Sequence, residues 1–126
     1  MRIIDTTTFF EEHFMMELRF NILDPYVDKF VVCEARFSHS GNEKDIKFNK
    51  KKYPQFEDKI IHLIVNKEPD DIIRKNNLST LDLRLNSISR IRHQRNYIAN
   101  SLKDYAADDY IIYSDNDEIP KLENFD

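Results

Sequence analysis

The chain has 126 residues, of which 40% are hydrophobic and 33% charged, so it is long enough for one domain with a buried core. The net charge of −4 gives no reason to expect nucleic acid as a partner, and no stretch reaches the roughly 20 apolar residues of a membrane span. A single cysteine, Cys33, excludes an internal disulfide, and a single glycine, Gly41, excludes a glycine-rich phosphate-binding loop. A nucleotide bound here must therefore be held by side chains and by a metal ion.

The first half of the chain predicts two strands separated by a helix. Arg2–Ile4 predicts a short strand, and the hydroxyls of residues 6–8 suit a turn or a helix cap. A helix is expected over residues 11–23, with an apolar stripe facing the core. The members of this stripe recur every four positions: Phe10, Phe14, Leu18 and Ile22. The apolar run Phe30–Cys33 predicts a second, buried strand that leads into Glu34.

The second half predicts two more strands and another helix. Residues 36–56 are polar and basic and predict a loop, and Ile60–Val65 predicts the third strand. Residues 66–85 are weakly patterned, so we expect a long, mobile connection. A helix over residues 87–105 follows, with the stripe Ile88, Ile91, Ile98, Leu102 and Tyr105. The fourth strand, Tyr110–Ser114, does not alternate, so we expect it to be buried on both faces.

Strands separated by helical patterns predict an α/β fold with a mostly parallel, twisted sheet and flanking helices. Ligands bind to open α/β sheets at the carboxyl ends of the strands. We expect Glu34 and Asp115 at the ends of two strands, where both would face the same crevice.

Three carboxylates follow the last strand within four residues: Asp115, Asp117 and Glu118. Carboxylates this close repel one another unless a cation lies among them. Hard divalent ions such as Mn²⁺ or Mg²⁺ prefer such oxygen ligands together with the phosphate oxygens of a substrate. The spacing therefore favours a metal–diphosphate site, in which the metal stabilises a diphosphate leaving group. The alternative is an acidic turn without a ligand, although Pro120 and the preceding strand favour a turn of fixed shape.

Other polar residues allow two interpretations each. Arg95 is expected on the core-facing stripe of the second helix, where it would either support the carboxylates and a nucleotide or extend to the helix edge. Gln94 and Asn96, which flank it, could hydrogen-bond a base or a ribose. Glu34 would accept hydrogen bonds from a nucleoside, or else be an ordinary charge at a strand end. For His39 and for the lysines of residues 44–52, a solvated loop is favoured over contact with an anionic ligand.

Several blocks of the chain share their order and spacing with a known family. They are Asp5–Phe10, Glu17–Asn21, Val27–Ala35, Ser38–Gly41, Asp58–His62, Gln94–Asn96 and Ser114–Pro120. On these blocks the chain resembles glycosyltransferase family 17, which includes the enzymes that add bisecting N-acetylglucosamine to glycans. The resemblance spans essentially the whole sequence, and the last two blocks together are its most specific part.

The resemblance implies a GT-A fold, of which residues 1–126 would form one domain, the Rossmann-like nucleotide-sugar-binding half. By that likeness, Asp115 and Asp117 would hold Mn²⁺ or Mg²⁺, and Asp115 would also bind the donor together with Glu34, Arg95 and Asn96. The general base of an inverting transferase and the acceptor contacts would lie beyond Asp126. We therefore expect either a fragment or a truncated protein that binds a donor without turning it over.

The partners implied by the resemblance are a nucleotide-sugar donor such as UDP-GlcNAc and a glycan or other hydroxyl acceptor, as in protein N-linked glycosylation. Because the sequence has no anchor, we expect a cytoplasmic protein or one peripheral to the cytoplasmic face of the membrane. A truncated sheet would expose apolar surface and favour self-association. Two other functions stay open: a non-catalytic α/β binding module, and a nucleotidyltransferase with a similar sheet and acidic pair.

Overall fold

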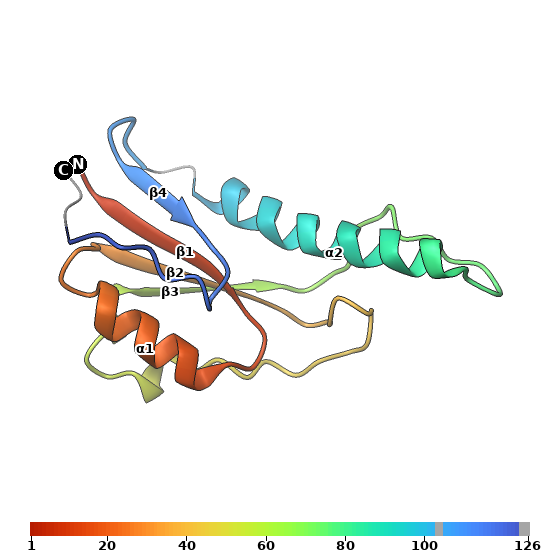
Figure 1. The fold of residues 1–126 in the computed structure, drawn as a ribbon, viewed down its shortest axis with the longest axis horizontal. Helices are drawn as coiled ribbons and strands as arrows, with labels where there is room; N and C mark the ends of the chain where they lie inside the picture. The colour runs from red at the N-terminus through yellow and green to blue at the C-terminus, as the bar shows by residue number, and fades with distance from the viewer. Residues whose placement is uncertain (103–104, 124–126) are drawn as a thin grey trace.

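A parallel sheet forms the centre of the fold in the computed structural model, which describes residues 1–102 and 105–123. The elements there are β1 (Ile3–Phe9), α1 (His13–Leu23), β2 (Lys29–Ala35), η1 (Lys50–Lys52), η2 (Glu57–Lys59), β3 (Ile60–Val65), α2 (Thr80–Ser101) and β4 (Tyr110–Tyr113). The strands lie in the order β3-β2-β1-β4, and all pairs are parallel. Helix α1 covers one face of the sheet and α2 the other (Figure 1). The predicted α/β fold is confirmed. Within the described residues, neither helix is both long and apolar enough to cross a bilayer.

Strand β1 is longer than predicted because threonines continue it. The expectation of a turn at Thr6 and Thr7 is wrong, since the strand runs on to Phe9. The hydroxyl of Thr6 donates to the carbonyl of Ile112 at 2.7 Å, and that of Thr7 donates to the carbonyl of Ser114 at 2.8 Å. A β-branched side chain suits a strand, and these bonds satisfy hydroxyls that are buried. The same bonds join β1 to the end of β4.

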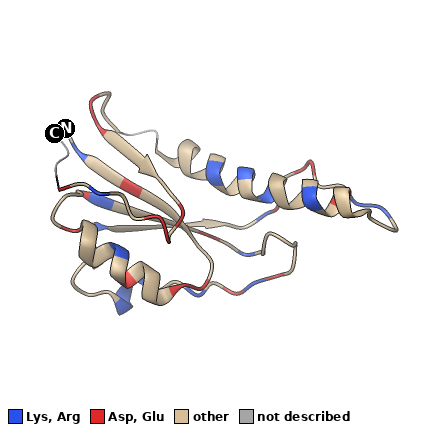
Figure 2. Ribbon diagram, in the orientation of Figure 1, with Lys and Arg blue, Asp and Glu red and all other residues tan. Residues whose placement is uncertain are grey.

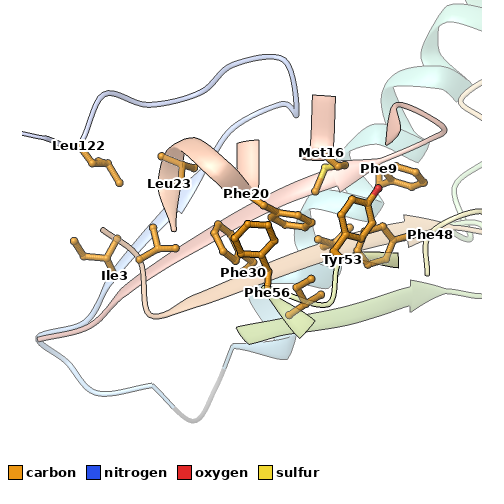
Figure 3. Packing of buried hydrophobic residues seen from close by; sticks show 13 residues of the cluster. Ile3, Phe9, Met16, Phe20, Leu23, Phe30, Phe48, Tyr53, Phe56 and Leu122 are labelled. Carbon is orange, nitrogen blue, oxygen red and sulfur yellow. The ribbon is translucent and has the colours of Figure 1, made fainter. Parts of the chain in front are cut away.

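The main core lies between α1 and the sheet (Figure 3). The residues of α1 that are buried there are Met16, Arg19, Phe20 and Leu23. The stripe predicted to face the core is wrong, because its members are exposed: Phe10, Phe14, Leu18 and Ile22. Both sets recur at helical spacing, so periodicity alone did not decide between them. The aromatic ring of Phe20 packs edge-on against Phe30 and Tyr53, which fixes the orientation of the helix.

Helix α2 begins earlier than predicted and turns a different face inward. It starts at Thr80, where the hydroxyl of Ser79 accepts from the backbone N–H of Asp82 at 3.0 Å and the Asp82 carboxylate accepts from Ser79 in return. Its buried residues are Asn86, Ser89, Arg90, Gln94 and Ile98. Of the predicted stripe, Ile98 is buried and Ile88 is exposed. The helix ends at Ser101, and residues 103–104 of the predicted helix lie outside the described residues.

The inward residues of α2 are polar because the helix binds the connection that precedes it. Asn86 accepts from the backbone N–H of Ile73 at 2.7 Å and donates to its carbonyl at 3.1 Å. Arg90 donates to Glu68 at 2.8 Å. These hydrogen bonds attach residues 66–79 to the helix, which extends past the strands in Figure 1. An apolar stripe is therefore not needed over this half of α2.

Strand β4 lies at the edge of the sheet, so the expectation that both its faces are buried is wrong. Within the described residues it pairs with β1 alone. Tyr110 and Ile111 are 47% and 46% exposed, whereas Ile112 packs against the main core. A short apolar run without alternation fits an edge strand as well as a central one.

Candidate metal and ligand site

A cavity opens where the strand order reverses direction. The chain passes from β1 to β2 on one side, and β4 returns to the other side of β1, so the carboxyl ends of β1 and β4 flank a topological switch point. The cavity there has a volume of ≈ 340 Å³. Residues from the ends of β1, β2 and β4 and from α2 line it: Thr8, Phe9, Phe10, Glu12, Ala35, Phe37, His39, Ile91, Gln94, Arg95, Asp115, Asn116 and Asp117.

Three exposed carboxylates gather in the turn after β4, where Figure 2 colours the acidic residues red. One carboxylate oxygen each from Asp115, Asp117 and Glu118 lies within 4.8 Å of the other two. Within the described part of the chain, none of the three makes an ion pair with a basic side chain within 4 Å. A hard divalent cation would relieve their mutual repulsion and could also coordinate the phosphate oxygens of a ligand. The donor set therefore fits Mn²⁺ or Mg²⁺.

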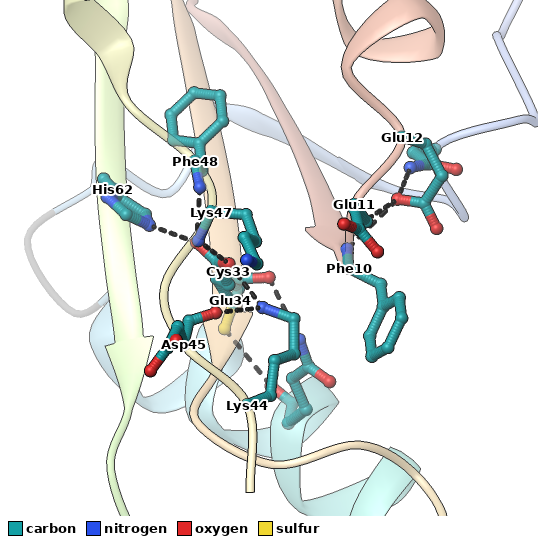
Figure 4. Close-up of polar contacts among 12 residues, drawn as sticks. Phe10, Glu11, Glu12, Cys33, Glu34, Lys44, Asp45, Lys47, Phe48 and His62 are labelled. Atoms are coloured by element: carbon teal, nitrogen blue, oxygen red, sulfur yellow. Dashed lines mark hydrogen bonds and ion pairs between the residues drawn. The ribbon is translucent and has the colours of Figure 1, made fainter.

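The acidic turn is joined to the loop that follows β1. The side-chain amide of Asn116 donates to the Glu12 carboxylate at 2.6 Å. The same carboxylate accepts from the backbone N–H groups of Phe10 at 3.0 Å and Glu11 at 3.1 Å (Figure 4). Burial alone would raise the pKa of Glu12, but these hydrogen bonds outweigh it and hold the pKa below its ordinary value. A charged Glu12 thus fixes one edge of the cavity.

Arg95 lines the same cavity as Asp115 and Asp117, but it does not lie on the core-facing stripe, and that expectation is wrong. Gln94 takes the inward position instead and donates from Nε2 to the carbonyl of Cys33 at 3.0 Å. The Arg95 side chain is exposed, with its guanidinium 4.9 Å from the ring centroid of Tyr113. A stacked guanidinium at the cavity mouth is placed to meet an anionic group of a ligand.

Asn96 does not reach this cavity. Its side chain is exposed on another side of α2 and lines a separate hollow with Asp71 and His93. Neighbouring helix residues point about 100° apart, so a helix that turns Gln94 inward directs Asn96 elsewhere.

Glu34 is buried in a network of hydrogen bonds rather than open to the cavity (Figure 4). Its carboxylate accepts from Lys44 Nζ at 2.5 Å, from the backbone N–H of Lys47 at 2.7 Å and from that of Phe48 at 3.0 Å. His62 Nε2 lies 3.2 Å from Oε1, the oxygen that also accepts from Phe48, whereas the two lysine donors bind Oε2. Burial would raise the pKa of Glu34, but His62, Lys44 and the backbone donors together lower it from 4.5 to about 2.

The expectation that Glu34 and Asp115 face one crevice is wrong. Successive residues of a strand point to opposite faces of the sheet, and Ala35 is the residue of β2 that lines the cavity. The side chain of Glu34 points to the α1 side, where Phe48 belongs to the main core. The carboxylate therefore holds the loop of residues 44–48 against the sheet.

His39 lines the cavity on a loop that α2 supports. Its carbonyl accepts from Arg90 Nη1 at 2.9 Å and from the hydroxyl of Ser87 at 2.9 Å. Gly41 in this loop has a φ of 91°, and a Cβ there would collide with the Arg90 guanidinium, so the position requires glycine. A loop held in this way places His39 at the cavity without making it part of the core.

Sequence reasoning missed the buried residues that support the site. Arg19, Asp5 and Asn116 were not singled out, and Gln94 was expected to bind a base or a ribose rather than the backbone of β2. The available signal was a charge inside an apolar segment, because Asp5 follows two isoleucines and Arg19 precedes Phe20. Such charges must find partners when they are buried, but the sequence does not say which ones.

The fold and the cavity define an α/β protein with an acidic turn beside a cavity at the switch point of a parallel sheet. The family model described as "Glycosyltransferase family 17" matches residues 1–126, and the chain belongs to this family. Similar proteins are the β-1,4-mannosyl-glycoprotein 4-β-N-acetylglucosaminyltransferases of Rattus norvegicus and Homo sapiens, each 28% identical, and of Mus musculus, 27% identical. Each comparison covers 94% of this chain and 22% of the relative, so the chain spans about a fifth of the length of these curated relatives. No solved structure matches the chain.

Proposed function

We propose that the chain forms the donor-binding half of a metal-dependent glycosyltransferase. The observation that carries the proposal is the cluster of Asp115, Asp117 and Glu118, which lies beside a cavity at the switch point and whose members have no basic partner within 4 Å among the described residues. The names of the similar proteins support N-acetylglucosamine as the transferred sugar. UDP-N-acetylglucosamine is therefore the donor to test first, and a hydroxyl group of a glycan is the acceptor.

We assign a role to several of the residues that line the cavity. Asp115 and Asp117 would hold Mn²⁺ or Mg²⁺, and the metal supplies positive charge that stabilises the diphosphate as a leaving group. Arg95 at the cavity mouth would contact the phosphates. Phe10, Phe37 and His39 offer ring faces against which a base could stack. Glu34 and Asn96 have no direct part in this proposal, since neither lines the cavity.

Isothermal titration of the 126-residue chain with UDP-N-acetylglucosamine tests this proposal. We expect binding in Mn²⁺ and none in EDTA, because the carboxylates would otherwise repel the diphosphate. Asp117→Asn removes one charged ligand and should weaken binding at least tenfold, or about 1.4 kcal/mol. The matched control is Asp108→Asn, which removes an exposed carboxylate just before β4, at the opposite end of that strand.

The control variant should bind as the unmodified chain does. Equal binding in EDTA, or an unchanged affinity in Asp117→Asn, would contradict the proposal. Release of N-acetylglucosamine 1-phosphate from the donor instead of UDP, with the uridylyl group passing to an acceptor, would identify a nucleotidyltransferase.

A further inference from the structure

One buried arginine uses its entire guanidinium to connect α1, β1 and the acidic turn. The side chain of Arg19 is 0% exposed. Nε donates to Asp5 Oδ2 at 2.8 Å and Nη2 donates to Asp5 Oδ1 at 2.7 Å. Nη2 also donates to the hydroxyl of Ser114 at 2.6 Å. Nη1 donates to the backbone carbonyls of Asp115 at 3.0 Å and Glu118 at 2.8 Å. A guanidinium has five N–H groups, and each one has a partner here.

Asp5 neutralises this buried charge from the centre of the sheet. It lies on β1, is 1% exposed, and binds the guanidinium through both carboxylate oxygens. A bidentate pair fixes the plane of the guanidinium as well as its position. The remaining N–H groups are therefore directed at one place, the Ser114 hydroxyl and the two backbone carbonyls of the acidic turn.

The two carbonyls that Nη1 binds belong to the first and last residues of this turn. The N–H of Glu118 also donates to the carbonyl of Asp115 at 2.9 Å, which closes the turn. Arg19 thus fixes the distance between the carbonyl oxygens of Asp115 and Glu118 from the buried side of the turn. In the turn, Arg19 binds the Ser114 hydroxyl and two backbone carbonyls and leaves the exposed carboxylates of Asp115, Asp117 and Glu118 to other partners. One oxygen of Glu118 accepts from the backbone N–H of Asp115 at 3.3 Å.

We propose that Arg19, oriented by Asp5, is the positioning residue of the metal site: it holds the turn of residues 114–118 in the one shape that directs three carboxylates at a single cation. This rests on the proposed function, because it assigns a purpose to that shape. Arg19 touches neither the metal nor the donor. It acts through the backbone, and its effect on metal affinity follows from pre-organisation of the ligands.

Arg19→Lys separates charge from geometry. Lysine keeps the positive charge beside Asp5, but its three donors radiate from one nitrogen and cannot reproduce the planar fork that reaches both carbonyls. The matched control is Arg2→Lys. Arg2 also pairs with an aspartate: its Nε at 3.2 Å and its Nη2 at 2.7 Å both donate to Oδ2 of Asp109, at the opposite end of the β1–β4 pair.

Two readouts are measured on the full chain: amide hydrogen exchange in EDTA, and Mn²⁺ affinity by electron paramagnetic resonance. In Arg19→Lys we expect exchange at residues 115–118 to accelerate about tenfold while the amides of β2 and β3 keep their rates, and Mn²⁺ to bind at least tenfold more weakly. Arg2→Lys should alter neither readout. Unchanged exchange at the turn, or unchanged Mn²⁺ affinity, would overturn the proposal.

Ser114→Ala is the second variant if Arg19→Lys fails to fold. It removes one acceptor of Arg19 and leaves the pair with Asp5 intact. We expect a smaller effect in the same direction, about threefold in both readouts, and no effect in either would overturn the proposal. If the unmodified chain itself fails to bind Mn²⁺, the proposed function is contradicted, and exchange at the turn alone decides whether Arg19 orders it.

Discussion

Glu34 shows how a buried carboxylate can stabilise the fold without taking part in ligand binding. It is 0% exposed, and a lysine, a histidine and two backbone N–H groups bind it. A buried charge is tolerated when its hydrogen bonds replace those of water, and the lowered pKa of about 2 is the mark of that replacement. The side chain thus anchors a long polar loop to β2.

The free energy of unfolding should decrease as the pH is lowered, because of Glu34. The pKa of Glu34 is lower in the folded chain than in the unfolded one, so its stabilisation is complete above pH 4.5 and is lost as the pH falls toward 2. Between pH 6 and pH 3 the loss from Glu34 should be about 2 kcal/mol. Urea unfolding at both pH values measures it, and Glu34→Gln should reduce this difference by that amount.

Glu17→Gln, an exposed position on α1, is the charge-matched control. An equal pH dependence in Glu34→Gln and the unmodified chain would contradict the account.

At the scale of residues, the sequence predicted what depends on local pattern. Three carboxylates directly after an apolar run placed the acidic turn correctly, because that spacing is visible in the sequence. The partners of Glu34 and Arg19 were not predictable. Arg19 meets Asp115 across 96 residues of sequence, and Glu34 meets His62 across 28. Such pairings depend on tertiary packing, which a single sequence does not specify.

Helix α1 carries two apolar stripes, and the structure buries only one of them. The buried stripe contains Phe20, whose ring packs among four aromatic rings at centroid distances of 4.8 to 6.4 Å. The other stripe contains Phe14, which is 76% exposed.

The two phenylalanines of α1 test this arrangement as a matched pair. Phe20→Ala should lower the free energy of unfolding by about 3 to 5 kcal/mol, because it leaves a cavity among packed rings. Phe14→Ala should change it by no more than about 0.5 kcal/mol, since the side chain lies in solvent. Urea unfolding at low protein concentration measures both. A loss in Phe14→Ala as large as in Phe20→Ala would show that the wrong face of α1 has been placed against the sheet.

At the scale of elements, it was easier to predict whether a segment is a helix or a strand than to predict which face of a helix is buried. β3 was predicted with the bounds that the structure shows, because Ile60–Val65 is apolar except for His62. α1 was predicted within two residues of its start for a similar reason. The inward face of α1 was predicted wrongly, and that of α2 was predicted only in part, because Ile98 is buried and Leu102 is partly buried whereas Ile88 is exposed. On α2 the inward residues are mostly polar and bind a loop, so a search for an apolar stripe missed them.

The whole molecule concentrates its chemistry at one end of the sheet. The order β3-β2-β1-β4 brings the loops after β1 and β4 together although about a hundred residues separate them in sequence. The alternation of strand and helix patterns predicted a parallel sheet. It also predicted that the site lies at the carboxyl ends of the strands. It did not predict that β4 lies at the edge beside β1, and therefore it did not predict which loops form the cavity.

The most direct test of the central claim is a Mn²⁺ titration of the uniformly ¹⁵N-labelled chain followed by nuclear magnetic resonance. A bound Mn²⁺ broadens the resonances of nearby nuclei, so the first signals lost mark the site. We predict that these belong to residues 115–118, followed by Thr8 and Phe10 of the cavity, while Asp108 and Asp109 at the other end of β4 keep their signals. Loss of the Asp108 and Asp109 signals at the same Mn²⁺ concentration as those of residues 115–118, or no selective broadening at all, would contradict the account.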